Sequence, residues 1–226
     1  MPSVAKKKKI HFLITAGGTR EYIDPVRFIS NASSGKMGYA LAQAAKAAGH
    51  NVTLISASQM QPPVGVEFVA VDSAVQVFGA VKRFFPKSDC LVMAAAVTDY
   101  TPAKPHKTKI KKKNQQLILK LKPTADILRW AGKNKSERRA TSDGPRFIVG
   151  FALEDKNLRS NAQKKLAAKE LDMIIANSPE SIGADRTTVQ IKTPGHRWLK
   201  VPEAEKSTVA RRIIKAIEAN IARMNR

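Results

Sequence analysis

Cysteine, aromatic residues and long apolar runs are scarce in this sequence. Its one cysteine, Cys90, excludes a disulfide within the chain. No apolar run approaches the ~20 residues that a membrane-spanning helix needs, and the stretch 10–16 is too short for a secretion signal. The 4 histidines show no metal-ligand spacing. We therefore expect a cytoplasmic protein with no membrane segment, no metal site built from its own side chains, and Cys90 in the core.

Acidic residues are also few, with 18 Asp and Glu against 40 Lys and Arg, which gives a net charge of +22. Such an excess serves either anionic small molecules or nucleic acid. The basic residues are spread over most of the chain, and no aromatic residues interleave with them in the way that stacks bases. The composition therefore favours small anionic ligands over specific nucleic-acid binding.

Short apolar runs alternate with helical patterns along most of the chain, which predicts an α/β fold with a doubly wound, mostly parallel, Rossmann-like sheet. We expect a single domain over 1–226, with 1–8 as a disordered basic tail and 136–145 as a flexible loop. The predicted strands are 10–15, 51–56, 66–71, 89–97, 147–152 and 173–176, and the predicted helices are 35–48, 73–85, 156–170 and one from about 203 onward.

Two segments depart from this alternation and predict antiparallel hairpins as an extension of the sheet. In the first, 109–113 and 117–121 are joined at Asn114-Gln115, and one arm is basic. In the second, 188–192 and 197–201 are joined through Pro194-Gly195.

Ligands of open α/β sheets bind beyond the carboxyl ends of the strands, where two phosphate-binding motifs nearly match. A P-loop fails because Met37 follows Gly35-Lys36 and Ser30 stands at the first glycine position. The dinucleotide fingerprint fails because Gly17-Gly18 is followed by a long polar loop, 19–33. A nicotinamide-dependent reductase therefore stays a minor alternative.

The physics of anion binding still applies to Ser33-Ser34-Gly35-Lys36, which open a predicted helix. Backbone N–H groups, hydroxyls and a lysine at a helix N-terminus attract anions. The alternative is that Ser33 or Ser34 only caps the helix.

Residues 14–38, ITAGGTREYIDPVRFISNASSGKMG, closely resemble the phosphopantothenoylcysteine synthetase family, the ligase half of the bifunctional coenzyme A biosynthesis flavoprotein of bacteria. The resemblance recurs at 94–100, 109–112, 126–128, 149–154 and 176–177, and covers about 9–220. One departure is Thr124-Ala125, where the family commonly has Asn-Pro. We expect a stand-alone ligase without the flavin-dependent decarboxylase half.

The resemblance implies a two-step reaction. The carboxylate of phosphopantothenate attacks the α-phosphate of a nucleoside triphosphate, pyrophosphate leaves, and the amine of cysteine then attacks the acyl-nucleotidylate. Bacterial members use CTP and eukaryotic members use ATP, so the expected co-substrate is CTP with Mg²⁺. A homodimer is implied as well.

The resemblance also assigns roles to single residues. Asn31 assists the second step, where a neutral donor can stabilise the oxyanion; otherwise it is a turn residue. Asp99 contacts the cytosine or its ribose, or else caps a turn. Lys109, Lys165 and Lys169 neutralise the triphosphate, the last two from one helix face, although a lone lysine is more often solvated surface. Phe151 packs against the base or sugar, or else belongs to the core.

The predicted catalytic residues are Asn31 and Lys109. The predicted nucleotide-binding residues are Gly17, Gly18, Ser33, Ser34, Gly35, Lys36, Met93, Ala94, Ala95, Asp99, Ala125, Asp126, Ile127, Leu128, Phe151, Lys165 and Lys169. A non-catalytic nucleotide- or nucleic-acid-binding protein of the same fold is the second hypothesis.

Overall fold

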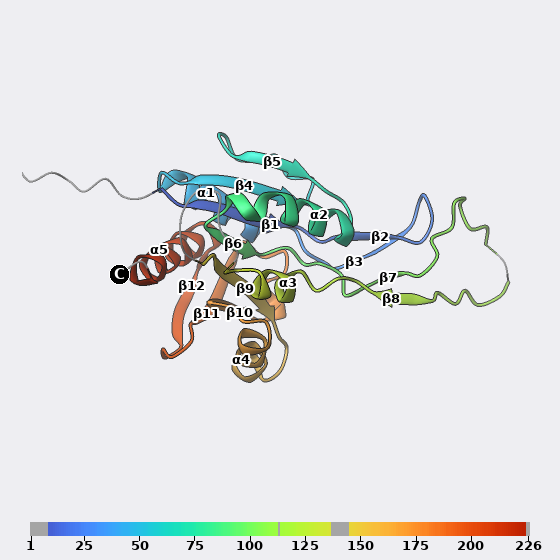
Figure 1. Cartoon of the computed structure of the whole chain (residues 1–226). Helices are drawn as coiled ribbons and strands as arrows, with labels where there is room; N and C mark the ends of the chain where they lie inside the picture. Colours follow the sequence, from blue (N-terminus) through green and yellow to red (C-terminus); the bar gives the residue numbers. More distant parts are fainter. Residues whose placement is uncertain (1–8, 113, 137–144, 225–226) are drawn as a thin grey trace, which may run out of the picture.

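A computed structural model describes residues 9–112, 114–136 and 145–224 of the chain. Its centre is an eight-stranded sheet in the order β12-β11-β10-β9-β6-β1-β4-β5 (Figure 1). The strands are β1 (His11–Ala16), β4 (Asn51–Ser56), β5 (Glu67–Ala70), β6 (Cys90–Met93), β9 (Phe147–Leu153), β10 (Met173–Asn177), β11 (Arg186–Lys192) and β12 (Leu199–Glu205).

Six neighbouring strands, from β5 to β10, run parallel, and β11 and β12 continue the sheet antiparallel. The chain moves outward from β1 through β4 to β5, returns to β6 on the other side of β1, and then moves outward again. This reversal of strand order is the switch point at which open α/β sheets bind ligands. The predicted mostly parallel, doubly wound sheet is confirmed.

Helices cover both faces because successive residues of a strand point to opposite sides. Phe12 and Ile14 of β1 face a core shared with α1 (Lys36–Ala47) and α5 (Lys206–Met224). Leu13 faces the other core, which is completed by α2 (Ala74–Phe84), α3 (Ile127–Lys133) and α4 (Leu158–Ala168). Cys90 is fully buried in the first core, and desolvation, followed by Asp172 and Asp89, raises the pKa of its thiol.

Two short antiparallel ribbons project from the sheet as an extension (Figure 1). One pairs β2 (Arg20–Tyr22) with β3 (Phe28–Ser30), and the other pairs β7 (Tyr100–Pro102) with β8 (Leu121–Pro123). Between them, Asp24 accepts a hydrogen bond from the backbone N–H of Ile110 at 3.1 Å. The two ribbons therefore lie side by side, tied through the loop that β2 and β3 enclose.

The strands predicted for the first hairpin are wrong. Residues 109–112 and 114–120 carry no strand, and the pairing lies outside them, between β7 and β8. Lysines at 109, 111 and 112 crowd like charge along the predicted arm, which opposes cross-strand pairing. The second hairpin is confirmed as β11 and β12, although both strands are longer than expected and α5 begins only at Lys206.

Other boundaries also differ from those predicted. The long polar loop 19–33 contains β2 and β3, and the strand expected over 89–97 ends at Met93, where the chain turns away from the sheet. Lys169 terminates α4 as its C-cap instead of lying inside the helix. Two short 3₁₀ turns, η1 (Phe85–Lys87) and η2 (Pro179–Ser181), complete the structure. The predicted tail 1–8 and most of the predicted loop 136–145 lie outside the described residues.

None of the described helices is long and apolar enough to cross a bilayer.

Candidate functional site

A cavity of about 720 Å³ opens at the carboxyl ends of the central strands. Behind the cavity, the segments that follow β1 and β6 remain paired: Ala96 N donates to Gly17 O at 2.9 Å, and Thr19 N donates to Ala96 O at 3.3 Å. The cavity is bounded by the start of α1, the segment after β6, the start of α3, the end of α4 and the segment after β10. It therefore lies at the switch point of the sheet, where the topology predicts a ligand site.

Close packing of glycines shapes the entry to α1. Gly35 has a φ of +80°, and a Cβ at this position would lie 2.8 Å from the Cβ of Ser58. Gly17, with a φ of +84°, lies so close to the backbone N of Ser58 that an added Cβ would be 2.6 Å from it. Both positions favour glycine because other residues rarely adopt this backbone conformation. The glycines thereby allow the start of α1 to approach the end of β1.

The N-cap of α1 is Gly35, and no side chain caps the helix. The expected capping alternative for Ser33 and Ser34 is therefore wrong, although Lys36 N makes a 3.4 Å contact with Ser34 Oγ. The carbonyl of Ser34 accepts a hydrogen bond from Ser58 Oγ at 3.1 Å, which fixes the backbone at this position. The first N–H groups of an uncapped helix need partners, and here they border the cavity. This arrangement suits an anion.

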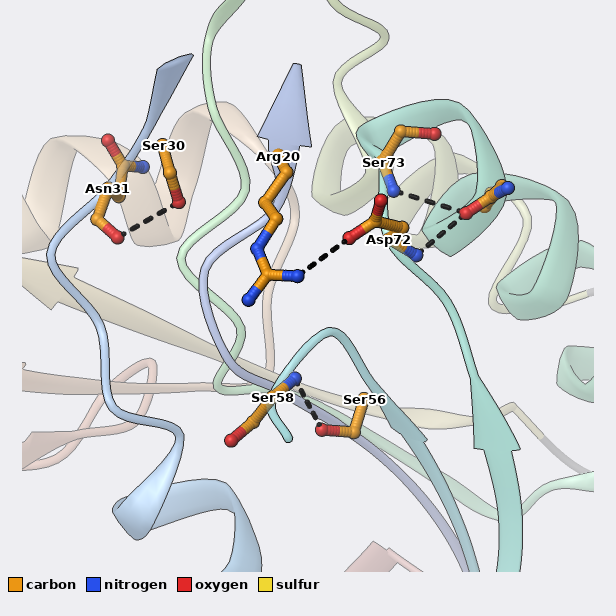
Figure 2. A network of polar contacts seen from close by, with 8 residues as sticks. Arg20, Ser30, Asn31, Ser56, Ser58, Asp72 and Ser73 are labelled. Carbon is orange, nitrogen blue, oxygen red and sulfur yellow. Dashed lines mark hydrogen bonds and ion pairs between the residues drawn. The ribbon is translucent and has the colours of Figure 1, made fainter. Parts of the chain in front are cut away.

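Asn31 connects the loop after β3 to the segment after β6. Its Nδ2 donates to the carbonyl oxygens of Ala96 at 3.3 Å and Val97 at 3.2 Å. Figure 2 shows Asn31 beside Ser30, whose hydroxyl donates to the Asn31 carbonyl at 3.3 Å. The exposed amide is thus held at the cavity wall by long hydrogen bonds. A charged acceptor would compete well with these two carbonyls for its N–H groups.

Polar contacts around the neighbouring strand ends fix the frame behind Asn31 (Figure 2). Arg20 Nη1 lies 3.5 Å from Asp72 Oδ1, and the backbone N–H of Arg20 donates to the Asp72 carbonyl at 2.7 Å. Ser58 N donates to Ser56 Oγ at 3.0 Å. The bonds between Arg20 and Asp72 tie β2, which pairs with β3, to the segment after β5, and the bond between Ser58 and Ser56 fixes the turn after β4.

Two lysines and a carboxylate from α3 and α4 form another wall. Lys165 Nζ donates to the Phe151 carbonyl at 2.8 Å, and Lys169 Nζ pairs with Asp126 Oδ1 at 3.2 Å. Asp126 is also the N-cap of α3 and accepts from Arg129 N at 3.0 Å. Burial, and then the neighbouring charge of Lys169, lowers the pKa of Lys165. A desolvated ammonium beside a second one favours an anionic ligand.

A second pair of lysines borders the segment after β10. Lys36 Nζ pairs with Asp185 Oδ1 at 2.6 Å, and Lys206 Nζ donates to the Ser181 carbonyl at 2.9 Å. Lys206 is buried, and it opens α5 after an antiparallel hairpin. The sequence analysis missed Lys206 because no motif marks it, and only the packing of α5 brings it to the cavity.

Sixteen of the predicted site residues line the cavity, and Gly17, Gly18 and Lys109 do not. The lining set is Asn31, Ser33, Ser34, Gly35, Lys36, Met93, Ala94, Ala95, Asp99, Ala125, Asp126, Ile127, Leu128, Phe151, Lys165 and Lys169. Gly17 and Gly18 pack behind the wall, where a Cβ on Gly18 would lie 2.5 Å from the Asn31 carbonyl oxygen. Lys109 is an exposed residue of the extension, next to the Ile110 contact with Asp24.

The cavity also includes residues that the sequence analysis did not select. These are Ala32, Met37, Gly38, Ala96, Val97, Tyr100, Pro123, Thr124, Leu153, Asn177, Ser181, Ile182, Gly183 and Lys206. Most lie within two residues of a predicted site residue, so their position near a motif was the available signal. The segment from Ser181 to Gly183 had no such signal.

No group of three or more His, Cys, Asp or Glu side chains in the described part of the chain could hold a metal ion. The cavity does contain two carboxylates, Asp99 and Asp126. Magnesium in nucleotide sites is commonly held by one or two carboxylates together with phosphate oxygens. These residues therefore fit a magnesium ion that arrives with a triphosphate.

Comparisons with known proteins find relatives of similar sequence and fold. The bifunctional coenzyme A biosynthesis protein CoaBC of Bacillus subtilis is 42% identical over 215 residues, which are 92% of this chain and 51% of that protein. The crystal structure of the C-terminal domain of a coenzyme A biosynthesis bifunctional protein CoaBC has a TM-score of 0.79 at 36% identity, over 96% of this chain and 97% of that one. A Cab2 mutant in complex with phosphopantothenate-cysteine, 17% identical with a TM-score of 0.76 over 96% and 89% of the two chains, shares the fold.

The chain spans about half the length of the curated relatives it matches. The family model that describes the DNA/pantothenate metabolism flavoprotein C-terminal domain matches residues 7–221. With nearly the whole chain inside that match, this protein belongs to the family of the DNA/pantothenate metabolism flavoprotein C-terminal domain.

Proposed function

We propose that the chain is a phosphopantothenate–cysteine ligase, which forms 4′-phosphopantothenoyl-cysteine with a nucleoside triphosphate. The observation that carries this proposal is the cavity itself. It brings together Asn31, Asp99 and the two lysines Lys165 and Lys169 from three separate segments, to which the resemblance to the synthetase family assigns roles. The relatives named as coenzyme A biosynthesis proteins support the same assignment.

In the first step, a carboxylate oxygen of phosphopantothenate forms a bond to the α-phosphorus of the triphosphate. The bond from the α-phosphorus to the bridging oxygen breaks, and pyrophosphate leaves with that electron pair. Several negative charges must share one site, so positioning and charge neutralisation supply most of the catalysis. Lys165 and Lys169 from α4 and the uncapped start of α1 provide the positive electrostatic environment.

In the second step, the amine of cysteine attacks the acyl carbon of the acyl-nucleotidylate. The amide bond forms, the bond from the acyl carbon to the phosphate oxygen breaks, the nucleoside monophosphate leaves, and the amine proton passes to solvent. A negative charge develops on the acyl oxygen in between. Asn31 donates to that oxygen from Nδ2, in place of its contacts with Ala96 and Val97.

CTP is the proposed nucleotide. Small side chains at Ala94 and Ala95 leave room for a base, Asp99 can accept from an exocyclic amine or a ribose hydroxyl, and Phe151 offers an apolar surface. Magnesium, held by triphosphate oxygens with Asp99 or Asp126, would neutralise phosphate charge. A direct comparison of CTP and ATP as co-substrates tests the nucleotide separately from the ligase reaction.

The proposal also includes a homodimer, which forms through contacts of the extension formed by the two ribbons. Its ribbons expose a set of large apolar side chains, Tyr22, Val26, Phe28, Tyr100, Leu117, Ile118 and Leu121. Burial of such a set is the usual reason for oligomerisation. Lys109 lies on the same extension and outside the cavity lining, so its proposed catalytic role requires that the segment 103–112 close over a cavity. That cavity is either its own or a second copy's.

The test is an assay of pyrophosphate and nucleoside monophosphate release with phosphopantothenate, with and without cysteine. If the protein is a ligase, we expect it to release up to one equivalent of pyrophosphate per site without cysteine. We expect continued turnover only when cysteine is present. A binding protein of the same fold would bind nucleotide and release neither product. That outcome would favour the second hypothesis, a non-catalytic nucleotide-binding protein.

A further inference from the structure

The two ammonium groups beside the segment after β10 are unevenly compensated. Lys36 Nζ has two partners, the Gly183 carbonyl at 3.1 Å and Asp185 Oδ1 at 2.6 Å. Lys206 Nζ has the neutral Ser181 carbonyl at 2.9 Å, and it makes no ion pair with another residue of the described ranges. One carboxylate therefore faces two lysines in this corner of the cavity.

The uneven charge compensation of the two lysines matters because Lys206 is buried. Lys206 is only 8% exposed, whereas the side chain of Asp185 is 83% exposed and well solvated. Desolvation, followed by the charge of Lys36, lowers the pKa of Lys206, and Asp185 acts in the opposite direction. A buried ammonium without an anionic partner is costly. An anion that reached this corner would supply the missing charge.

The corner lies apart from the lysine pair of α4, and of its two lysines only Lys36 belongs to the predicted site residues. Lys165 and Lys169 come from α4, which covers one face of the sheet. Lys36 and Lys206 open α1 and α5, which cover the other face. Both pairs border the same cavity, which therefore presents ammonium groups on two of its walls.

We propose that Lys206 and Lys36 form a second phosphoryl-binding subsite, in which Asp185 is the resting partner of Lys36 and is displaced by the incoming oxyanion. The identity of the ligand rests on the proposed ligase function. Two molecules of that reaction carry the required chemistry, namely the part of the triphosphate that leaves as pyrophosphate and the 4′-phosphate of phosphopantothenate.

Calorimetric titration with inorganic pyrophosphate tests the subsite without turnover. Because a hydrogen bond between charged groups is lost, Lys206→Met should weaken pyrophosphate binding about tenfold or more. Lys206→Arg, which keeps the charge, should retain most of the affinity. Lys215→Met removes the same charge from an exposed position of α5 and should change little. Thermal melting of each variant verifies that it is folded.

Steady-state kinetics then identify the phosphate. A higher KM for CTP in Lys206→Met, together with weaker pyrophosphate binding, assigns the subsite to the triphosphate. A higher KM for phosphopantothenate, with no change for unphosphorylated pantothenate, assigns it to the 4′-phosphate.

The subsite is refuted if Lys206→Met leaves pyrophosphate affinity and both KM values unchanged, or if Lys215→Met changes them equally. An inactive ligase whose pyrophosphate binding depends on Lys206 would refute the proposed function and leave the subsite standing.

Discussion

The side-chain nitrogen of Asn31 lies 3.2 Å from the carbonyl oxygen of Val97, which joins the loop after β3 to the segment after β6. This contact places a neutral donor at the wall of the cavity, next to the turn formed by Ala94 and Ala95. The amide can be removed without changing the lysines that we propose to neutralise phosphate. The two chemical steps of the proposed reaction can therefore be separated by one substitution.

Asn31→Ala should keep the first step and lose the second. Removal of one oxyanion donor typically slows a reaction by about a hundredfold or more, so amide formation should fall by that factor. Pyrophosphate release from CTP and phosphopantothenate should continue to about one equivalent per site. Rapid-quench measurement of pyrophosphate and of phosphopantothenoyl-cysteine checks both steps.

Ser30→Ala is the matched control, because it removes only the 3.3 Å hydrogen bond to the Asn31 carbonyl. It should leave both steps near their wild-type rates. Wild-type product formation by Asn31→Ala would show that the amide has no role in the second step.

Nucleotide affinity should depend on the protonation of Lys165. Burial and the charge of Lys169 lower its pKa in the free protein, while Glu154, Asp99 and Asp126 partly oppose that effect. A bound triphosphate favours the ammonium and raises the pKa again. Binding therefore takes up a proton at pH values between the lowered pKa of the free protein and the raised pKa of the complex, and affinity falls as the pH rises through that window.

Calorimetric titration of CTP from about pH 7 to about pH 10 checks the sign, since this range lies below the ordinary pKa of lysine. Lys165→Arg stays protonated over this range, so its affinity should vary less with pH than that of the wild type. Parallel pH profiles for the two proteins would remove Lys165 from the nucleotide site.

The sheet could be read from the sequence because each parallel strand is a short apolar run bounded by polar segments. Residues such as 51–56 and 173–176 have no other reasonable assignment. The extension could not be read in the same way, because β2, β3, β7 and β8 each have three residues. Pairings this short are stabilised by tertiary contacts such as Asp24 to Ile110, which leave no local pattern.

The residues of the candidate site also fall into a group that the sequence predicts and a group that it does not. Asn31 and Lys165 were predicted from the order of motifs along the chain, and both line the cavity. Lys206 was not predicted, because only the packing of α5 brings it to the cavity, and neither was Asp185, which reaches Lys36 through the path of the segment after β10. Long-range packing of this kind has no signature in a single sequence.

Substitution of Gly35 should damage both the fold and the anion site. An alanine there would be strained at a φ of +80° and would place its Cβ 2.8 Å from Ser58. Gly49→Ala is a close comparison, since Gly49 has a φ of +87° with nothing within 4 Å of an added Cβ. Gly49→Ala should lower the free energy of unfolding by about 1 kcal/mol from backbone strain alone, and Gly35→Ala should lower it further.

Urea denaturation measures the two stabilities, and CTP titration measures the site. Gly35→Ala should weaken CTP binding because Ser34 and Lys36 shift with it, whereas Gly49→Ala should not. Equal effects of the two alanines on stability and on CTP affinity would contradict the close packing of α1 against Ser58.

Arg146 should contribute to stability and not to activity. Its side chain is almost fully buried just before β9, at the end of that strand opposite the cavity. It donates to the carbonyl oxygens of Phe85 at 2.7 Å, Pro86 at 3.2 Å and Asn134 at 3.5 Å. Arg146→Met leaves these acceptors without their donor and should cost about 2–4 kcal/mol in the free energy of unfolding. Pyrophosphate release per folded molecule should match the wild type, and a lower rate at full folding would show that the two ends of the sheet are coupled.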